Sequence, residues 1–159
     1  MKKLFFTLFL ALFAAACLQE LPQAPKLEAE LPVAGSEEIW KTADQKGQPV
    51  LIAFMGTWCP WCKRSLPALD AASDAFAGKA VVVGAFVDDD EDAVLEVIKQ
   101  HDMKTKALYN SREVSQQMGV AGFPHIMLFD KKHRLVKVWN GYGPDLEVQF
   151  KEELSKLTD

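Results

Sequence analysis

The chain has 159 residues, of which 49% are hydrophobic and 25% are charged. This composition suits one globular domain with an appendage. The net charge of −4 and the isoelectric point near 5.4 exclude a general electrostatic attraction to nucleic acid, and the sequence contains no internal repeat.

The first 16 residues have the pattern of a secretory signal peptide. Lys2 and Lys3 form a basic start, and residues 4–16 are an uncharged apolar run that ends in small residues. Such a run is too short to span a bilayer as a helix, which needs about 20 residues. The alternative is a buried N-terminal helix, but no polar face interrupts the run.

Cys17 directly follows this run, in the sequence AAAC. The motif resembles a lipobox, in which the cysteine is lipidated and becomes the new N-terminus, although Ala14 stands where leucine is commonest. The alternative is cleavage near Ala16 that leaves Cys17 as a free thiol. We expect lipidation, because an odd cysteine in a secreted protein needs a use.

Residues 17–35 are expected to form a flexible tether. Beyond Cys17 the segment holds three prolines, three glutamates and no aromatic residue. A composition of this kind buries little apolar surface. The folded domain is therefore predicted to comprise residues 36–159.

Strands and helices are predicted to alternate along this domain. In chain order we expect a helix capped by Ser36, a strand at 49–55, a helix at 59–76, a strand at 80–87, a helix at 93–101, a strand at 105–109, a helix at 112–118, strands at 125–129 and 134–139, and a helix from Pro144. The two apolar runs at 49–55 and 80–87 are typical of strands buried on both faces. The last two strands alternate well enough for an antiparallel hairpin. The pattern predicts an α/β domain with a mixed central β-sheet flanked by helices.

The acidic cluster from Asp88 to Asp92 could be interpreted as a cation site. Acidic side chains also favour a helix N-terminus, where unpaired N–H groups carry partial positive charge. We prefer the second interpretation, because the glycine and the distal glutamate of a calcium loop do not follow.

The stretch GTWCPWCKRSLP (56–67) places Cys59 after a predicted buried strand and at the start of a helix. A helix N-terminus favours a thiolate, and the N–H groups of Trp61 and Cys62 can point back at the Cys59 sulfur. Cys62 lies one turn further on, at a spacing that allows a disulfide without straining the helix. The pair can therefore attack a partner's disulfide through Cys59 and resolve the mixed disulfide through Cys62.

A structural disulfide and a zinc site are the alternatives for this pair. A structural bridge stabilises most when it closes a long loop, which this spacing does not do. Zinc needs about four ligands, and only three histidines remain as imidazole donors, with Cys17 across the tether. Redox chemistry is the preferred interpretation, and no metal is expected.

The segment AFMGTWCPWCKRSLP resembles the active site of the thioredoxin superfamily, in which Pro67 matches the proline that kinks the active-site helix. GVAGFPHIMLFD (119–130) resembles the second family signature, and WNGYG (139–143) resembles the end of the last strand beside the same groove. The stretch from Gly84 to Val120 resembles the αβ segment that extracytoplasmic members of the TlpA kind insert before the cis-proline.

The resemblance implies a thioredoxin-like fold over residues 36–157 and a redox-active disulfide, Cys59–Cys62, with no organic cofactor. It implies that Pro124 is the cis-proline. It also implies a substrate groove around the sulfurs, in which aromatic surface suits an extended peptide. Trp61 is expected to be the most exposed side chain because it falls between the two cysteines, and the alternative for Trp58 and Phe123 is that they belong to the core. The expected groove residues are Trp58, Pro60, Trp61, Phe123, Pro124, Gly141 and Tyr142.

Three features depart from the family pattern. Ala53 stands where cytosolic thioredoxins carry a buried aspartate, and Ser65 stands where many cytochrome-maturation relatives carry a glutamate. The dipeptide between the cysteines is Pro-Trp. Because these positions bear on proton transfer and redox potential, the sequence does not fix the direction of electron flow.

His125 follows Pro124 and starts a strand near the predicted site. As a cation it would lower the pKa of Cys59. The alternative, which we prefer, is a solvent-facing residue at a strand end.

The predicted function is that of a thiol–disulfide oxidoreductase acting on protein cysteines outside the cytoplasm, in a bacterial periplasm or cell envelope, with the reducing direction slightly favoured. The expected partners are client proteins, a membrane or periplasmic redox partner, and the membrane itself through the lipid anchor; no nucleic acid is expected. One alternative is a non-catalytic metal-binding or delivery module that uses Cys59, Cys62 and His125. Another is a thiol peroxidase, although Thr57 lies one residue too close to Cys59 for that family and the upstream proline is missing.

Overall fold

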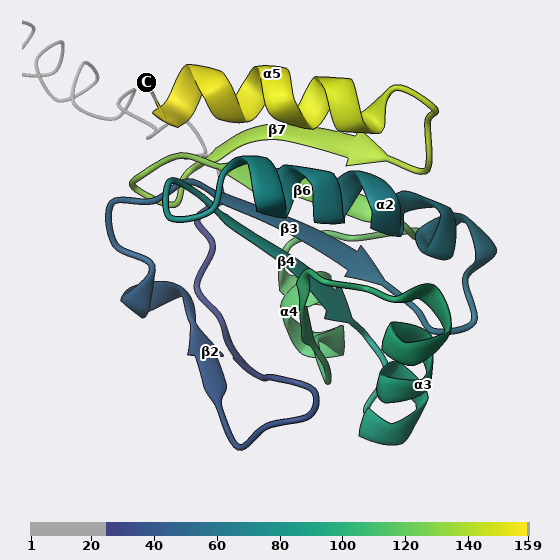
Figure 1. The fold of residues 1–159 in the computed structure, drawn as a ribbon. Helices are drawn as coiled ribbons and strands as arrows, with labels where there is room; N and C mark the ends of the chain where they lie inside the picture. Colours follow the sequence, from purple (N-terminus) through teal and green to yellow (C-terminus); the bar gives the residue numbers. More distant parts are fainter. Residues whose placement is uncertain (1–24, 159) are drawn as a thin grey trace, which may run out of the picture.

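The computed structural model describes residues 25–158, which form a five-stranded mixed sheet with a two-stranded hairpin beside it (Figure 1). In the order β5-β4-β3-β6-β7, the strands of the sheet are Lys106–Leu108, Val81–Phe86, Val50–Met55, His125–Phe129 and Leu135–Asn140. β3, β4 and β5 are parallel, whereas β6 is antiparallel to both β3 and β7. The expected strands, the closing hairpin and the mixed sheet are confirmed.

Four α-helices accompany this sheet in the described part of the chain. They are α2 (Pro60–Ala75), α3 (Glu91–His101), α4 (Arg112–Gln117) and α5 (Leu146–Thr158). Each begins within two residues of its predicted start, which is the usual uncertainty of a helix end. Because α3, β5 and α4 lie between β4 and β6 in the chain, the αβ segment predicted to precede Pro124 is also confirmed.

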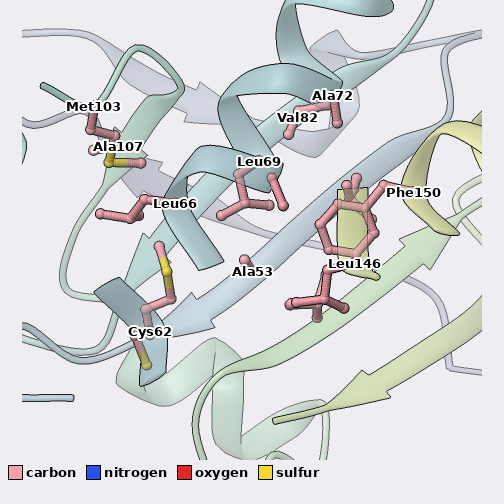
Figure 2. Close-up of a cluster of buried hydrophobic side chains, with 14 of the residues drawn as sticks. Ala53, Cys62, Leu66, Leu69, Ala72, Val82, Met103, Ala107, Leu146 and Phe150 are labelled. Atoms are coloured by element: carbon pink, nitrogen blue, oxygen red, sulfur yellow. The ribbon is translucent and has the colours of Figure 1, made fainter. Parts of the chain in front are cut away.

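β3 is buried on both faces, as its continuous apolar sequence predicts. Leu51, Ala53 and Met55 belong to the core on the side of α2 and α5. Figure 2 shows Leu69 of α2 and Phe150 of α5 beside Ala53 in this core. The alternate residues of β3 face a second core on the opposite side of the sheet.

Residues 25–41 cover that second face, so the prediction of a tether that extends to residue 35 is wrong for its C-terminal part. β1 (Glu30–Pro32) pairs with β2 (Ile39–Lys41), and apolar side chains of this segment are buried: Leu27, Ala29, Leu31, Val33 and Trp40. The sequence KLEAELPV places an apolar residue at every second position, which is the period of a strand with one buried face. The folded domain therefore begins near residue 26.

The helix predicted to follow Ser36 is also wrong. Gly35 has a φ of 80°, and the Ser36 hydroxyl accepts the N–H of Glu38 (3.2 Å) within a turn rather than at a helix start. β2 follows, and a short 3₁₀ helix, η2, spans Thr42–Asp44. In β2 the exposed Ile39 and the buried Trp40 alternate as strand residues do, and pairing with β1 satisfies the backbone.

The expected signal peptide, residues 1–16, and the expected lipidation site, Cys17, lie outside the described residues. Within residues 25–158 no helix has both the length and the apolar composition needed to cross a membrane.

Candidate active site

Cys59 and Cys62 form a disulfide at the start of α2, with their Cα atoms 5.3 Å apart. Cys59 directly follows the loop after β3, and Cys62 lies inside the first turn of the helix. The exposed fraction is 4% for Cys59 and 1% for Cys62, so Cys62 is the more deeply buried of the two. The arrangement allows the pair to open and close within one helical turn.

The start of α2 is built around the Cys59 sulfur. Cys59 occupies the N-cap position, and its sulfur accepts the N–H of Cys62 at 3.2 Å. Pro60 is at the first helical position, where it needs no hydrogen-bond acceptor. This backbone N–H and the positive end of the helix dipole favour a thiolate at Cys59 once the disulfide is reduced.

A contact between Thr57 and Asp88 holds the loop before Cys59, and sequence reasoning missed it. The Asp88 carboxylate accepts both the backbone N–H of Thr57 (2.9 Å) and its hydroxyl (2.8 Å). Met55 pairs with Phe86 in the parallel sheet, so Thr57 and Asp88 lie two residues beyond that pair, where the carboxyl ends of β3 and β4 meet. That register is the signal that could have found the contact.

Exposed aromatic side chains surround the start of α2. Trp58 is 64% exposed and Trp61 is 52% exposed, so the expectation that Trp61 is the most exposed of them is wrong. Trp58 meets Phe123 edge to face, with the ring centres 5.8 Å apart, and Trp61 stacks on Tyr142 at 6.0 Å. The structure thus brings the predicted aromatic residues together in two pairs. Each pair joins a tryptophan beside Cys59 to an aromatic residue from the C-terminal part of the chain.

Gly56 is required by the position of the Trp58 ring. A Cβ atom at Gly56 would lie 2.7 Å from that ring, which is closer than real contacts allow. The glycine therefore lets the exposed indole fold back over the loop that carries Cys59.

The second tryptophan, Trp61, is contacted by a cation. The Arg64 guanidinium lies 4.6 Å from the centre of the Trp61 ring and makes a cation–π contact.

The segment that contains Pro124 borders a cavity of about 470 Å³. The Phe123–Pro124 peptide bond is cis, as the family resemblance implies. The Pro124 carbonyl accepts the N–H of Gly141 at 2.8 Å, which ties this segment to the end of β7. Phe123, Pro124, His125 and Gly141 thus share one cavity.

His125 is half-buried at the start of β6, where it faces Asn140 of β7 in the sheet register. Burial lowers the pKa of His125, and a hydrogen bond with Asn140 opposes that shift only in part. The imidazole is therefore neutral at pH 7. A neutral ring supplies no positive charge to Cys59, which argues against His125 as an electrostatic activator.

No aspartate or glutamate among residues 25–158 is buried. Ala53 is fully buried in the same core as Cys62, and Ser65, also fully buried, donates its hydroxyl to the Cys62 carbonyl at 2.7 Å. The two positions at which relatives carry an acid therefore hold no proton donor of that kind.

The acidic cluster after β4 serves the fold. Asp90 caps α3 by accepting the N–H groups of Asp92 (3.0 Å) and Ala93 (3.4 Å), and Asp88 holds Thr57. Within residues 25–158 no group of three or more histidine, cysteine, aspartate or glutamate side chains is placed to hold a metal ion.

A redox pair at the start of a helix that packs on a mixed sheet defines a thioredoxin-like protein. Residues 22–138 match the model of the AhpC/TSA family, and the chain belongs to that family. Among curated proteins it is 31% identical over 117 residues to the thiol-disulfide oxidoreductase ResA of Bacillus thuringiensis subsp. konkukian, covering 72% of this chain and 66% of that protein. It is 29% identical over 122 residues to the thiol:disulfide interchange protein DsbE of Pseudomonas aeruginosa, covering 70% of this chain and 66% of the relative. The chain thus spans about two thirds of the length of these relatives.

Solved structures confirm the thioredoxin-like fold. A thiol-disulfide isomerase from Corynebacterium glutamicum superimposes with a TM-score of 0.74 at 20% identity, covering 87% of this chain and 99% of that one. The exposed lipoprotein thioredoxin of Streptococcus pneumoniae superimposes with a TM-score of 0.71 at 24% identity, covering 82% of this chain and all of that one. The family match over residues 22–138 and the 31% identity to ResA confirm the expected membership of the thioredoxin superfamily, and α3, β5 and α4 form the expected insertion.

Proposed function

We propose that this protein is a thiol–disulfide oxidoreductase that acts on cysteines of other proteins outside the cytoplasm. The observation that carries the proposal is the Cys59–Cys62 disulfide at the N-terminus of α2, where the Cys62 N–H points at the Cys59 sulfur. The curated relatives named above are described as oxidoreductase and interchange proteins of the same chemistry. The sulfurs carry the electrons, so the reaction needs no organic cofactor.

The reaction follows from the two positions. The Cys59 thiolate attacks one sulfur of a client disulfide, a mixed disulfide forms, and the other client sulfur leaves as a thiolate and takes a proton. Cys62 then loses its proton and attacks Cys59, which forms the Cys59–Cys62 disulfide and releases the second client thiol. Two electrons have moved from this protein to the client, and the same steps run backwards oxidise a client dithiol.

We take reduction as the working direction, with a membrane or periplasmic redox partner that returns the electrons. A redox titration of the Cys59–Cys62 pair against glutathione, followed by thiol alkylation, tests the direction. A reduction potential near the roughly −270 mV of thioredoxin supports a reductase, whereas a value near the roughly −120 mV of the strong periplasmic oxidase reverses the direction.

Client segments are proposed to dock across the aromatic pairs and the cavity beside Pro124. Trp58 and Trp61 offer exposed apolar surface on either side of Cys59 in the sequence, and Phe123 and Tyr142 support those two rings. Main-chain groups near Gly141 lie at the edge of the same region. The groove would also include Pro60 and Pro124, and an extended peptide suits such a surface.

The protein is proposed to reach its compartment through a signal peptide at residues 1–16 and to be held there by a lipid on Cys17. The motif AAAC supports this anchor. One thioredoxin of the same fold is described as an exposed lipoprotein, so the fold is compatible with such an anchor. Mass spectrometry of the N-terminus of membrane-fractionated protein tests it: an unmodified Cys17 in fully soluble protein overturns the proposal.

Trapping of clients tests the assigned roles of the two sulfurs. The Cys62→Ser variant keeps the nucleophile but cannot resolve the mixed disulfide, so client proteins should accumulate on it in non-reducing gels. The Cys59→Ser variant, the matched control, should trap nothing. Trapping by the Cys59→Ser variant alone would reverse the two roles, and trapping by neither variant would contradict the exchange mechanism.

A further inference from the structure

A second cavity, of about 620 Å³, lies at the end of the sheet opposite the cysteines. Its walls come from three segments that are distant in the sequence: residues 26–30, 42–47 and 131–133. In the antiparallel pairing of β3 with β6, Val50 faces Phe129 while Phe54 faces His125. The loop after Phe129 therefore lies beside the start of β3, whereas Cys59 follows its other end.

Lysines dominate the rim of this cavity. Four lysines line it, together with two glutamates: Lys26, Lys46, Lys131, Lys132, Glu28 and Glu30. Glu28 lies 3.4 Å from Lys26, and Glu30 is paired with Lys41, just outside the lining, at 2.9 Å.

Three of the rim lysines are exposed and without a carboxylate within ion-pair distance in the described part of the chain: Lys46, Lys131 and Lys132. Asp130 precedes two of them, but its carboxylate is bound by Arg134 at 2.7 Å. Asp44, near Lys46, is the remaining carboxylate of these segments. The four lysines and two glutamates that line the cavity thus give its rim a net positive charge, although the whole chain has a net charge of −4.

The N-terminal segment joins the domain at this same end. The Pro25 carbonyl accepts the N–H of Leu135, and the N–H of Leu27 donates to the carbonyl of His133 (3.2 and 3.0 Å). Cys17 is eight residues before Pro25. Eight residues span at most about 29 Å when fully extended. An anchor at Cys17 would therefore hold the lysine-rich end close to the membrane.

We propose that the end bearing Lys46, Lys131 and Lys132 faces an anionic phospholipid surface, so that Cys59 and Cys62 face away from the bilayer. The inference rests on the proposed membrane anchor. Anionic headgroups attract lysines near the surface, and the attraction falls off within about 8 Å at physiological salt. The chemical consequence is that clients meet the redox pair from the aqueous side, and a membrane redox partner must present its cysteines above the headgroups.

Lysine acetylation tests this orientation. The full chain, as the cell processes it, is bound to vesicles of phosphatidylcholine alone or of phosphatidylcholine mixed with phosphatidylglycerol, and acetylated lysines are quantified by mass spectrometry. Lys46, Lys131 and Lys132 should react several-fold more slowly on the anionic vesicles, and high salt should remove the difference. Lys99 on α3 and Lys63 beside the redox pair should react equally on both.

Three results would overturn the inference. One is equal reactivity of the three lysines on both vesicle types, and another is protection of Lys63 in their place. The third is the same protection by inorganic phosphate on neutral vesicles, which would make the cavity a phosphate site rather than a membrane surface. The Lys46→Gln/Lys131→Gln/Lys132→Gln variant checks the assignment. Lys26, on the same rim, should also react more slowly on anionic vesicles in the wild-type protein and should lose that protection in the variant.

The orientation and the proposed function can fail separately. Reduction of insulin by the same vesicle-bound protein reports thiol–disulfide exchange and does not depend on orientation. Protection without exchange would leave the orientation standing and remove the function. Exchange without protection would leave the function standing and remove the orientation. Loss of the protein from vesicles of both kinds would contradict the anchor on which the orientation rests.

Discussion

Where β3 and β4 end, Cys59 and exposed tryptophans gather at the start of α2, whereas at the opposite end of the sheet lysines surround the entry of the chain. The difference follows from helix polarity. α2 begins at the first end, so its free N–H groups favour an anionic sulfur there. At the second end the described residues place no cysteine. The redox pair and the entry of the chain into the domain are thus separated by the length of the sheet.

The largest expected effect is on catalysis, and it should differ between substitutions at the two ends of β3. Cys59→Ser, just after the strand, should abolish insulin reduction in a dithiothreitol-coupled turbidity assay, because no nucleophile remains to attack the disulfide. Gln48→Ala, just before the same strand, removes only a side-chain contact with the Gly78 carbonyl (3.0 Å) and should keep the wild-type rate. Comparable losses in both variants would point to a general effect on the fold and remove the contrast.

The second prediction concerns residues 25–41, which enter at the lysine-rich end and cover the second face of the sheet. Leu31→Ala should reduce the free energy of unfolding by about 2–5 kcal/mol, because Leu31 is 3% exposed and its truncation leaves a cavity in the second core. Ile39→Ala, in the partner strand, should change it by less than about 0.5 kcal/mol, because Ile39 is 48% exposed. Urea unfolding measures both.

Equal and small effects of these two substitutions would mean that residues 25–35 are a tether, as their composition predicts. The buried alternation from Leu27 to Val33 argues for the opposite result.

The sequence predicted the elements that have a long apolar run or a distinct helix start. The apolar run of β3 and the start of α2 at Cys59 are both readable, because a buried strand and a helix start have distinct local chemistry. β1 and β2 were missed because each has three residues, so alternation is too brief to outweigh the prolines and glutamates around them. Their stability comes from pairing with each other and from the sheet beneath, which is a tertiary effect.

In the candidate site, too, local features could be predicted from the sequence and tertiary contacts could not. The cysteine pair and the aromatic residues could be named from motifs, since their spacing is local. The Thr57–Asp88 contact could not, because it depends on which strands are neighbours and in which register they pair. The neutral state of His125 depends on its burial between strands, which single-sequence periodicity does not reveal.

The third prediction tests the support of the redox loop. Thr57→Val removes a hydroxyl from a carboxylate that is half-buried, and should cost about 1.5 kcal/mol of stability, at the low end for hydrogen bonds to charged groups. It should also slow alkylation of reduced Cys59 at fixed pH, because the loop that places the sulfur is held less firmly. Thr57→Ser, which keeps the hydroxyl, should restore both values. A Thr57→Ser variant as impaired as Thr57→Val would mean that packing of the methyl group, and not the bond to Asp88, supports the loop.

The smallest expected effect concerns pH. The pKa of His125 is lowered in the folded protein, so the unfolded chain binds the proton more readily. Stability from the neutral ring is therefore fully present above the unfolded pKa of about 6.5 and is lost as the pH falls through the lowered folded value. Wild-type protein should lose more unfolding free energy than His125→Gln between pH 7 and pH 5, measured by urea unfolding of the disulfide form. The pH profile of Cys59 alkylation should be nearly the same in both proteins, because a neutral imidazole adds no charge beside the sulfur. A clear rise of the Cys59 pKa in His125→Gln would show that the imidazole is charged and activates the thiol, which would contradict the neutral assignment.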